Sequence, residues 1–303
     1  MKFTPITPAD RGHLLKYFDK QEYPLSSYSL PGILVWNNCA FNNYYNKNED
    51  MLLVSESHIA NPKARWLLMP LGMEVPPDQL AVLAKKSGHS IYRYVPQEYV
   101  DRYGEAAVAA SFAISRELEY DDYIYKRSDL AGLKGAKFHK KRNLIAQFER
   151  DVKASTPVEV EMMSAETARQ AREFVDRWYQ ARREKYSFWT DELGCERQAL
   201  LQTLDNFVLV GAQGLVVRIG GKIEGLGIAS QLTDEMSVLN FEKANEEYHG
   251  LYQFLDRECA VRLFPERAFI NKESDLGDEG LRHAKESYHP VKKAVSLRME
   301  LKG

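Results

Sequence analysis

The clearest pattern of hydrophobic and polar positions lies in the second half of the chain. Phe174, Trp178 and Ala181 recur at the spacing of one helix face, which predicts an amphipathic helix over residues 164–185. Short apolar or alternating runs between polar turns predict strands. The expected strands are residues 158–162, 214–219, 222–232, 236–243, 268–271 and 294–301, and the further helices are residues 248–263 and 278–286. Strands and helices therefore alternate in this half, which predicts an α/β fold.

The first half carries a weaker pattern that is compatible with the same kind of fold. Strands are expected near residue 3 and at residues 51–55, 66–69 and 91–95, and helices from about residue 8 and at residues 77–86. The longest apolar stretch of the whole chain, residues 207–219, is interrupted by Gln213 and Arg218, so we expect no membrane-spanning segment. The first 25 residues carry charges throughout and do not resemble a secretion signal.

An internal repeat links the two halves. Residues 123–130 read YIYKRSDL and residues 269–276 read FINKESDL, with five of eight positions identical. A second, shorter match follows each octamer at nearly the same offset. A chance match of one octamer is the alternative, but two blocks in register favour an ancient duplication. We therefore expect two domains, residues 1–152 and residues 153–303, joined by a linker over residues 153–157.

Several motifs carry a resemblance to a known family. In the second half they are FEKA at residues 241–244, Gly250 with Gln253, NKESDLG at residues 271–277 and GLRHAKESYHPVK at residues 280–292; in the first half they are residues 123–125, Leu133, Gly135, Lys137 and residues 139–143. These residues resemble the C-terminal domain family of phosphatidylglycerol lysyltransferases, within the GNAT-like acyltransferase superfamily. The resemblance and the order of elements imply an α/β (α+β) fold with a tandem duplication of two GNAT-like units, each a mixed sheet flanked by helices.

The resemblance also implies a transferase. Characterised relatives in the family move an aminoacyl group from a charged tRNA to a lipid head group, so the expected co-substrate is an aminoacyl-tRNA and the expected acceptor is a lipid or a small molecule. Two alternatives stay open. One is an N-acyltransferase that uses acyl-coenzyme A, and the other is a non-catalytic module of the same fold that binds RNA or a peptide. The expected partners are a charged tRNA and the surface of an anionic membrane.

The loop at residues 245–252 is the expected donor site, because backbone N–H groups at the start of a helix can bind an anion. Gly250 would allow a close approach of the backbone, although it could be only the glycine that starts the helix. A coenzyme A loop usually reads (Gln/Arg)-x-x-Gly-x-(Gly/Ala), whereas Glu247 and Tyr252 hold the outer positions here and disfavour coenzyme A. In the first half the Pro76-Pro77 pair removes N–H donors, so that half is expected to lack a donor loop. The expected donor-binding residues are Tyr248, His249, Gly250, Gln253, Asn271, Glu273, Arg282 and Lys285.

Three side chains are candidates for the acyl-transfer chemistry. Glu242, at the end of a strand, and Asp275, just after the next strand, could act as a base or bind the amino group of an aminoacyl donor. Tyr288, or alternatively Ser287, could give a proton to the leaving group. For Asp275 a structural role in the turn after Ser274 stays open, and Glu242 could be only a surface residue of its strand.

Residues 126–153 form a basic segment in a nearly neutral chain. They hold nine Lys or Arg and three acidic residues, a local net charge of +6 on a chain of formal net charge −2. The dense part, His139, Lys140, Lys141 and Arg142, is the expected phosphate- or RNA-binding patch, with a solvated helix face as the alternative. The helix expected over residues 164–185 is basic as well and could extend this patch if the two segments meet. The overall charge excludes a uniformly basic nucleic-acid binder.

The three cysteines give no sign of a covalent or metal framework. Cys39, Cys195 and Cys259 are widely spaced, without CxxC or Cys/His spacing, so we expect neither a disulfide framework nor a structural zinc site. The histidines are isolated and suggest no metal ligands. Cys259 lies among apolar helix positions and is expected in the core. At 303 residues the chain can build two domains without such staples, and a reduced, cytoplasmic setting is expected.

Overall fold

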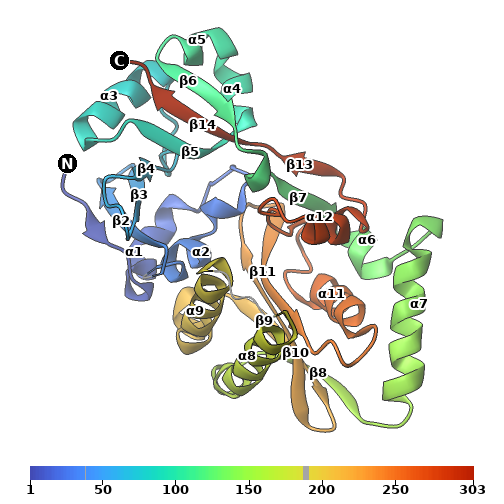
Figure 1. The fold of residues 1–303 in the computed structure, drawn as a ribbon. Coiled ribbons are helices and arrows are strands. Elements are labelled where there is room, and N and C mark those ends of the chain that lie inside the picture. Colours follow the sequence, from blue (N-terminus) through green and yellow to red (C-terminus); the bar gives the residue numbers. More distant parts are fainter. Residues whose placement is uncertain (38, 187–190) are drawn as a thin grey trace.

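Two mixed seven-stranded sheets form the frame of the molecule, with helices on their faces (Figure 1). The computed structural model describes the whole chain except residue 38 and residues 187–190. The first sheet has the order β1 (Thr4–Pro5), β2 (Phe41–Lys47), β3 (Leu52–His58), β4 (Arg65–Leu67), β5 (Ile91–Pro96), β14 (Ser296–Leu301), β6 (Phe112–Arg116). The second sheet has the order β13 (Lys292–Ala294), β7 (Asp122–Lys126), β12 (Phe269–Asn271), β11 (Met236–Ala244), β10 (Lys222–Gln231), β9 (Gln213–Ile219), β8 (Val158–Met162).

Twelve α-helices accompany these strands in the part of the chain that the structure describes. They are α1 (Arg11–Leu14), α2 (Leu30–Val35), α3 (Pro77–Ser87), α4 (Gln97–Tyr103), α5 (Glu105–Ala109), α6 (Arg127–Gly132), α7 (His139–Phe148), α8 (Ala165–Tyr186), α9 (Asp191–Asp205), α10 (Phe207–Val210), α11 (Leu251–Arg262) and α12 (Glu279–Glu286). A π-helical turn over Glu149–Lys153 extends α7, and the domain boundary expected at residue 152 falls inside it.

The two sheets exchange one strand each. β14, from the end of the chain, lies between β5 and β6 in the first sheet, and Met299 pairs with Ile114 there. β7, from the first half, lies between β12 and β13 in the second sheet (Figure 1). When the first sheet is followed from β1 and the second sheet from β8, each has five strands in chain order, then a strand from the other half, and then a sixth strand of its own half. This repeated order, with a parallel pair at β4–β5 and at β11–β12, confirms the expected tandem of two similar sheet-centred units.

The octamer repeat does not mark equivalent strands of the two units. Residues 123–126 lie in β7 and residues 269–271 form β12, and these strands are antiparallel neighbours in one sheet, with Tyr125 opposite Ile270. The place of β12 in the first sheet is held by β5. The two Ser-Asp-Leu segments differ as well, because Leu130 is buried in α6 whereas Leu276 is 59% exposed in a loop. The interpretation of the octamers as matching copies was therefore wrong, although the tandem architecture stands on the topology.

The strand expected at residues 294–301 is divided between the two sheets. β13 ends at Ala294 in the second sheet, and β14 begins at Ser296 in the first. Strand β2 was not predicted, because its sequence FNNYYNK alternates poorly and has a buried amide. The side chain of Asn43 donates to the carbonyls of Ile33 (2.9 Å) and Trp36 (3.2 Å) and closes the end of α2. Such a buried polar contact cannot be recognised from hydrophobic spacing.

Helices α8 and α11 cover opposite faces of the second sheet. Phe174 of α8 packs in the same core as Val216, whereas Phe254 of α11 packs with Leu215 and Val217. Successive residues of a strand point to opposite faces, so these two cores lie on the two sides of β9. The α8 side, which shares its core with the first sheet, is called the inner face below, and the α11 side is called the outer face. Because α7 packs on α11, the basic helices α7 and α8 lie on different sides and do not form one patch, contrary to the extended surface considered above.

A disulfide between Cys39 and Cys195 joins the loop after α2 to α9. This corrects the expectation that the cysteines form no disulfide. The two residues are 156 positions apart and come from different halves, so no local spacing could reveal the pair. Cys259 is free and buried, as expected. Within the described ranges, no helix is both long enough and apolar enough to cross a membrane.

The strand exchange predicts that a residue near the C-terminus stabilises the first sheet. Met299 in β14 is fully buried, so Met299→Ala should lower the free energy of unfolding by about 2–5 kcal/mol. Met73→Ala is the matched control, because Met73 is 46% exposed and its truncation should change stability by less than about 0.5 kcal/mol. Equal effects of the two substitutions in urea unfolding would contradict the exchange.

The disulfide predicts a redox-dependent stability. A crosslink over so long a loop typically contributes about 2–4 kcal/mol by restricting the unfolded chain. Reduction with dithiothreitol should therefore lower the midpoint of urea unfolding, and Cys195→Ser should lower it by a similar amount. In Cys195→Ser itself dithiothreitol should have no further effect. A reduced wild-type chain as stable as the oxidised one would show that the crosslink does not form.

Candidate functional site

The candidate site lies where β11 and β12 stop pairing. The two strands are parallel partners only from Met236 to Val238, opposite Phe269 to Asn271. Beyond that point β11 continues to Ala244 without a neighbouring strand on this side, within the described chain. We call residues 239–244 the open edge of β11. Ligands of α/β sheets commonly bind at the carboxyl ends of parallel strands, which is the position of this edge.

A β-bulge lies at the start of the open edge. β10 pairs Ala229 with Leu239 and Ile228 with Phe241, so Asn240 is an extra residue on β11. A bulge bends its strand and redirects its side chains, and bulges occur often beside active sites. The bulge brings Asn240 to the inner side, while Glu242 contacts groups on the outer side.

A buried ion cluster occupies the outer side of the open edge. The ammonium of Lys272 lies 3.0 Å from a carboxylate oxygen of Glu242 and 2.7 Å from Oδ1 of Asp256 on α11. The side chains of Lys272 and Glu242 keep only 13% and 16% of their surface exposed. Together with Tyr288 and Lys141, which lie against them, these residues are called the Lys272 cluster. One ammonium is thus shared by two carboxylates in a nearly water-free place.

Burial and charge shift the acid–base properties of this cluster. Burial raises the pKa of Glu242 to about 7, against the opposite pull of the Lys272 ammonium. Burial disfavours the charge on Lys272, but Asp256 and Glu242 outweigh it and raise the pKa of Lys272, so the ammonium stays charged. A carboxyl group that titrates near neutral pH next to a fixed cation is a common arrangement for acid–base chemistry.

Tyr288 packs between two ammonium groups. Its ring centroid is 3.9 Å from Nζ of Lys141 and 5.1 Å from Nζ of Lys272. Lys141 also donates a hydrogen bond of 2.7 Å to the hydroxyl of Ser287. Burial raises the pKa of Tyr288 well above its usual value, so the phenol keeps its proton at neutral pH. Cation–π contacts of this kind fix the ring and leave the hydroxyl as a proton donor.

On the inner side a chain of hydrogen bonds leads from the first half to Glu273. Ser29 and Ser230 share a hydrogen bond of 2.7 Å, and the Ser230 hydroxyl donates to the side-chain oxygen of Asn240 (2.7 Å). Asn240 in turn bonds to Glu273. Burial raises the pKa of Glu273 to about 8, and its φ of +59° places it in a region that side chains rarely adopt. The open edge therefore has one carboxyl group on each face.

The loop after β12 is held by residues that were candidates for donor binding. Lys285 donates to the carbonyls of Glu273 (3.1 Å) and Ser274 (2.7 Å), and burial lowers its pKa to about 8. Asn271 donates to the carboxylate of Asp122 (2.8 Å) and accepts from the backbone N–H of Glu273 (2.6 Å). Both side chains fix the backbone around Glu273.

Asp275 serves the turn after β12. Its carboxylate accepts hydrogen bonds from the Tyr123 hydroxyl (2.6 Å), the Arg282 guanidinium (3.0 Å) and the Gly277 N–H (2.9 Å). Burial would raise the pKa of Asp275, but these donors outweigh it and lower the pKa to about 2. A carboxylate that accepts three hydrogen bonds is a poor base. Asp275 therefore fits the structural role in the turn that was left open above, and Arg282 takes part in the same turn.

The start of α11 is covered by α7. Gly250 begins the helix with a φ of +88°, and a Cβ there would lie 2.1 Å from the carbonyl oxygen of Leu144. The glycine thus allows the backbone of α7 to approach the start of α11. This matches the alternative given above, in which Gly250 is only the glycine that starts the helix. Tyr248 and Gln253 beside it are half-buried and His249 is exposed. Glu246 in this loop binds Arg182 of α8 at 3.0 Å.

The four residues of the expected basic patch point to different places. Lys141 turns inward to the Lys272 cluster, and Arg142 donates to the carbonyls of Leu133 and Gly135. His139 contacts Asn143 of its own helix at 3.4 Å. Lys140 is exposed. The patch is therefore weaker as a phosphate site than its sequence suggests, and one of its members belongs to the ion cluster instead.

Sequence reasoning missed Lys272 and Asp256. Lys272 lies between two candidate residues, Asn271 and Glu273. Successive side chains of a strand point to opposite faces of the sheet, so a known strand register would have placed Lys272 on the same face as Glu242. Asp256 lies three residues after Gln253, in a helix whose buried positions are mostly apolar. A carboxylate on the buried face of a helix was the available signal, although Glu258 carries the same signal.

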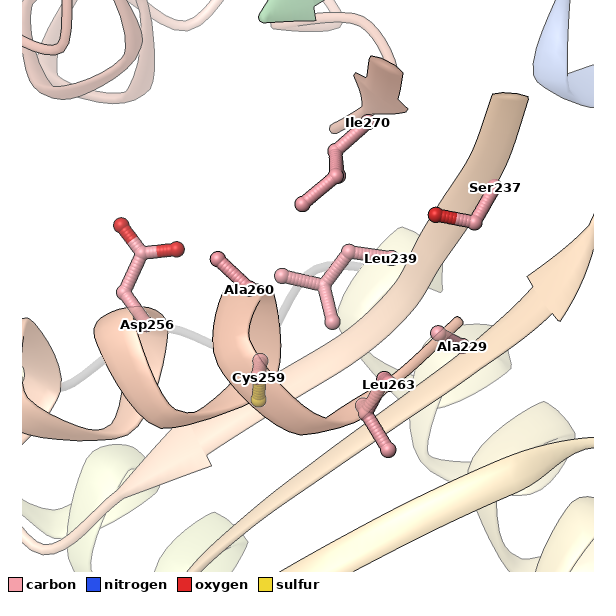
Figure 2. Close-up of a pocket in the computed structure, with 8 residues that line it drawn as sticks. All are labelled: Ala229, Ser237, Leu239, Asp256, Cys259, Ala260, Leu263 and Ile270. Carbon is pink, nitrogen blue, oxygen red and sulfur yellow. The ribbon is translucent and has the colours of Figure 1, made fainter. Parts of the chain in front are cut away.

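Two hollows border the second sheet. A cavity of about 10 Å³ lies beside Asp256, under Ile270 and Leu239 (Figure 2). A larger groove of about 310 Å³ lies between the halves at the opposite ends of β11 and β12, with Glu98 and Glu235 among its lining residues. The groove and the Lys272 cluster have no residue in common. Among the described residues, no group of three or more His, Cys, Asp or Glu is placed to hold a metal ion.

The close contact at Gly250 gives a direct test of the covered loop. Gly250→Ala should destabilise the fold by about 1–2 kcal/mol for its positive φ and by about 1–3 kcal/mol more for the clash with Leu144. Gly221→Ala is the matched control, because Gly221 has a φ of +81° and no atom within 4 Å of the added Cβ. Thermal or urea unfolding of the two variants measures the difference. Equal losses would mean that α7 leaves the start of α11 accessible.

Comparison with known proteins supports the motif analysis. The solved structure of a conserved protein of unknown function from Bacteroides thetaiotaomicron VPI-5482 is similar to this chain, with 28% identity over 100% of both chains and a TM-score of 0.88. The C-terminal domain (DUF2156) of a candidate lysylphosphatidylglycerol synthetase from Agrobacterium fabrum aligns with 98% of this chain and 92% of its own, at 12% identity and a TM-score of 0.64. At 12% identity this second likeness concerns the fold alone.

A search of the curated proteins gave no match. The family model described as "Phosphatidylglycerol lysyltransferase, C-terminal" matches residues 42–297 of this chain. That range includes the whole second sheet, most strands of the first sheet and every residue of the Lys272 cluster. The resemblance seen in the motifs is thereby confirmed, and the chain belongs to the family of phosphatidylglycerol lysyltransferase C-terminal domains.

Proposed function

We propose that this chain is an acyltransferase that moves an aminoacyl group from a charged tRNA to a lipid or small-molecule acceptor, at the open edge of β11. The observation that carries the proposal is the pair of partly buried carboxyl groups on the two faces of this edge, Glu242 and Glu273, with the charged Lys272 beside them. Membership of the family supports the reaction class.

The cluster has the groups that acyl transfer from an ester requires. The acceptor hydroxyl or amine attacks the ester carbonyl and gives its proton to the Glu242 carboxylate, which is partly charged at neutral pH. The ammonium of Lys272 stabilises the negative charge that forms on the carbonyl oxygen. The ester C–O bond then breaks, and the ribose oxygen leaves with a proton from the Tyr288 phenol. Glu242 returns its proton to Tyr288, so the site is restored.

Glu273 is suited to the amino group of the donor. It is half-buried and held on the inner side by Asn240, opposite the proposed base. An incoming ammonium would favour the charged form of Glu273, because opposite charges stabilise each other in a place with little water. Asn271 and Lys285 are positioning residues in this account, since they fix the backbone on which Glu273 stands.

The covered start of α11 favours a tRNA over coenzyme A. A pyrophosphate would need free N–H groups at this helix terminus, but the backbone of α7 lies against Gly250 and an exposed carboxylate, Glu247, stands beside it. A tRNA instead binds over a wide surface, for which the exposed Lys140 and His139 of α7 are available. A charged tRNA as donor requires a cytoplasmic reaction, whereas structural disulfides such as Cys39–Cys195 are rare in the reducing cytoplasm.

Exposed apolar residues near α12 support a lipid acceptor. Leu276 and Val291 flank this helix, Leu281 lies on it, and all three are exposed. Lys292 follows directly and is exposed as well. Apolar side chains next to basic ones favour contact with an anionic membrane surface. The segment also supplies Tyr288, so a lipid bound there would lie close to the proposed site.

A transfer assay with radiolabelled aminoacyl-tRNA and extracted lipids or a total cell extract tests this function. The wild-type chain should transfer label, with a rate that rises with pH and levels above about pH 7, because the base is Glu242. Glu242→Gln should lower the rate by about 10²–10⁴-fold. Glu159→Gln, an exposed carboxylate on β8, is the control and should leave the rate unchanged.

Three results would contradict the proposal. Transfer of an acetyl group from acetyl-coenzyme A, without transfer from tRNA, would indicate the other donor. Salt-sensitive tRNA binding without turnover on any acceptor would indicate a binding module. An active Glu242→Gln variant would remove Glu242 from the chemistry.

A further inference from the structure

We propose that Asp256 is a positioning residue of this site, which pairs with the Lys272 ammonium and thereby leaves Glu242 free to accept a proton at neutral pH. This role rests on the proposed function of the open edge, whereas the protonation state of Glu242 can be tested without any transfer activity. Asp256 acts through the groups that it contacts, the Lys272 ammonium and the Tyr288 phenol, and does not itself touch the substrate in the proposed reaction.

The geometry gives Asp256 the stronger share of Lys272. Its Oδ1 lies 2.7 Å from Nζ, compared with 3.0 Å for the oxygen of Glu242. Asp256 stands on α11, in the rigid second turn of a helix that packs on the sheet, and only 2% of its surface is exposed. Glu242 has a longer side chain and remains 16% exposed. The ammonium is therefore fixed from the helix side, and Glu242 faces it from the side of the open edge.

The second oxygen of Asp256 is not paired with Lys272. The phenol of Tyr288 interacts with this carboxylate, while Oδ2 is buried and has no hydrogen-bond partner of ordinary geometry among the residues that the structure describes. It borders the small cavity, whose wall is otherwise mostly apolar, with Leu239, Cys259 and Ile270 (Figure 2). Replacing a buried ion cluster as a whole by apolar side chains is often neutral or stabilising, so stability alone does not explain why this cluster is charged. Buried charges beside a candidate site indicate a functional role.

The charges in the cluster explain what Asp256 does. With Glu242 charged, the outer side holds two carboxylates and the single buried ammonium of Lys272. If Asp256 were neutral, Lys272 and Glu242 would form a simple ion pair and Glu242 would be a weak base. With Asp256 charged, Lys272 is already paired, and burial together with the charge of Asp256 raises the pKa of Glu242 to about 7. Two nearby carboxyl groups with different environments can divide such roles.

Other groups around Glu242 do not replace this effect. The charged neighbours besides Asp256 are Lys141 from α7, Lys243 from β11 and Lys272 after β12, and each of them favours the charged form of Glu242. The neutral neighbours are Tyr125, Tyr252, Tyr288 and Cys259, whose pKa values are all raised by burial. Among the described residues that act on Glu242, Asp256 is thus the negative neighbour that opposes the three cations.

The decisive variant is Asp256→Asn, which keeps the shape of the side chain and removes its charge. In the pH–rate profile of kcat the acid limb should move from about pH 7 to lower pH by about one unit or more, with the plateau rate lower and KM unchanged. Glu258→Gln is the matched control, because Glu258 lies on the same helix and pairs with Arg262 outside the cluster. Its acid limb should stay in place.

Two measurements test the same point without activity. Carbon-13 NMR of the Glu242 carboxyl, assigned with Glu242→Gln, should show titration near pH 7 in the wild type and lower in Asp256→Asn. A carboxyl whose pKa is raised on folding makes the fold less stable as pH rises from its unfolded value of about 4 to about 7. This fall in unfolding free energy between pH 5 and pH 8 should be smaller in Asp256→Asn.

The outcomes separate the two proposals. A wild-type Glu242 that titrates below pH 5, or an Asp256→Asn variant that loses activity with an unchanged acid limb and an unchanged NMR titration, would overturn the role of Asp256. A chain that transfers nothing, but whose Glu242 titrates near pH 7 and shifts in Asp256→Asn, would support the role of Asp256 and contradict the proposed function.

Discussion

Where β12 ends at Asn271, the chain turns away from β11, and the next side chain, Lys272, places its ammonium in the space that opens between the two strands. A buried cation needs opposite charges around it, and these come from Glu242 on β11 and Asp256 on α11. The ring of Tyr288 and, through it, Lys141 of α7 complete the arrangement. The ammonium of Lys272 thus holds together the end of the β11–β12 pair, helix α11 and the segment after α12.

The exchange of β7 and β14 makes this arrangement depend on both halves. β7 stands next to β12, and its Tyr123 holds the turn at Asp275 that directs the chain after Lys272. The hydrogen bonds on the inner side begin at Ser29, in the first half. Hydrophobic spacing predicted most strands of the second half, but it could not predict the exchange, because a strand's pattern indicates which face is buried and not which sheet receives it. The disulfide between Cys39 and Cys195 escaped prediction for a similar reason, since it depends on the packing of α9 against the loop after α2.

The candidate site was predictable in part. The motifs singled out Glu242, Glu273 and Tyr288, and the structure brings these residues together around the open edge. They did not separate groups that face the open edge from groups that hold the backbone, because that depends on hydrogen bonds between distant residues. Asp275, with three donors from three segments, is the clearest case. Gly250 is another such case. A side chain at this position would collide with the carbonyl of Leu144, which lies 106 positions earlier in the chain.

The most direct test of the account is a crystal structure with an aminoacyl-adenosine analogue in which an amide replaces the reactive ester. The account predicts that the amide carbonyl lies at the open edge of β11, within hydrogen-bond distance of Nζ of Lys272, with the amino group toward Glu273. An analogue bound instead in the groove beside Glu98 and Glu235, with Lys272 still enclosed by its two carboxylates, would contradict it.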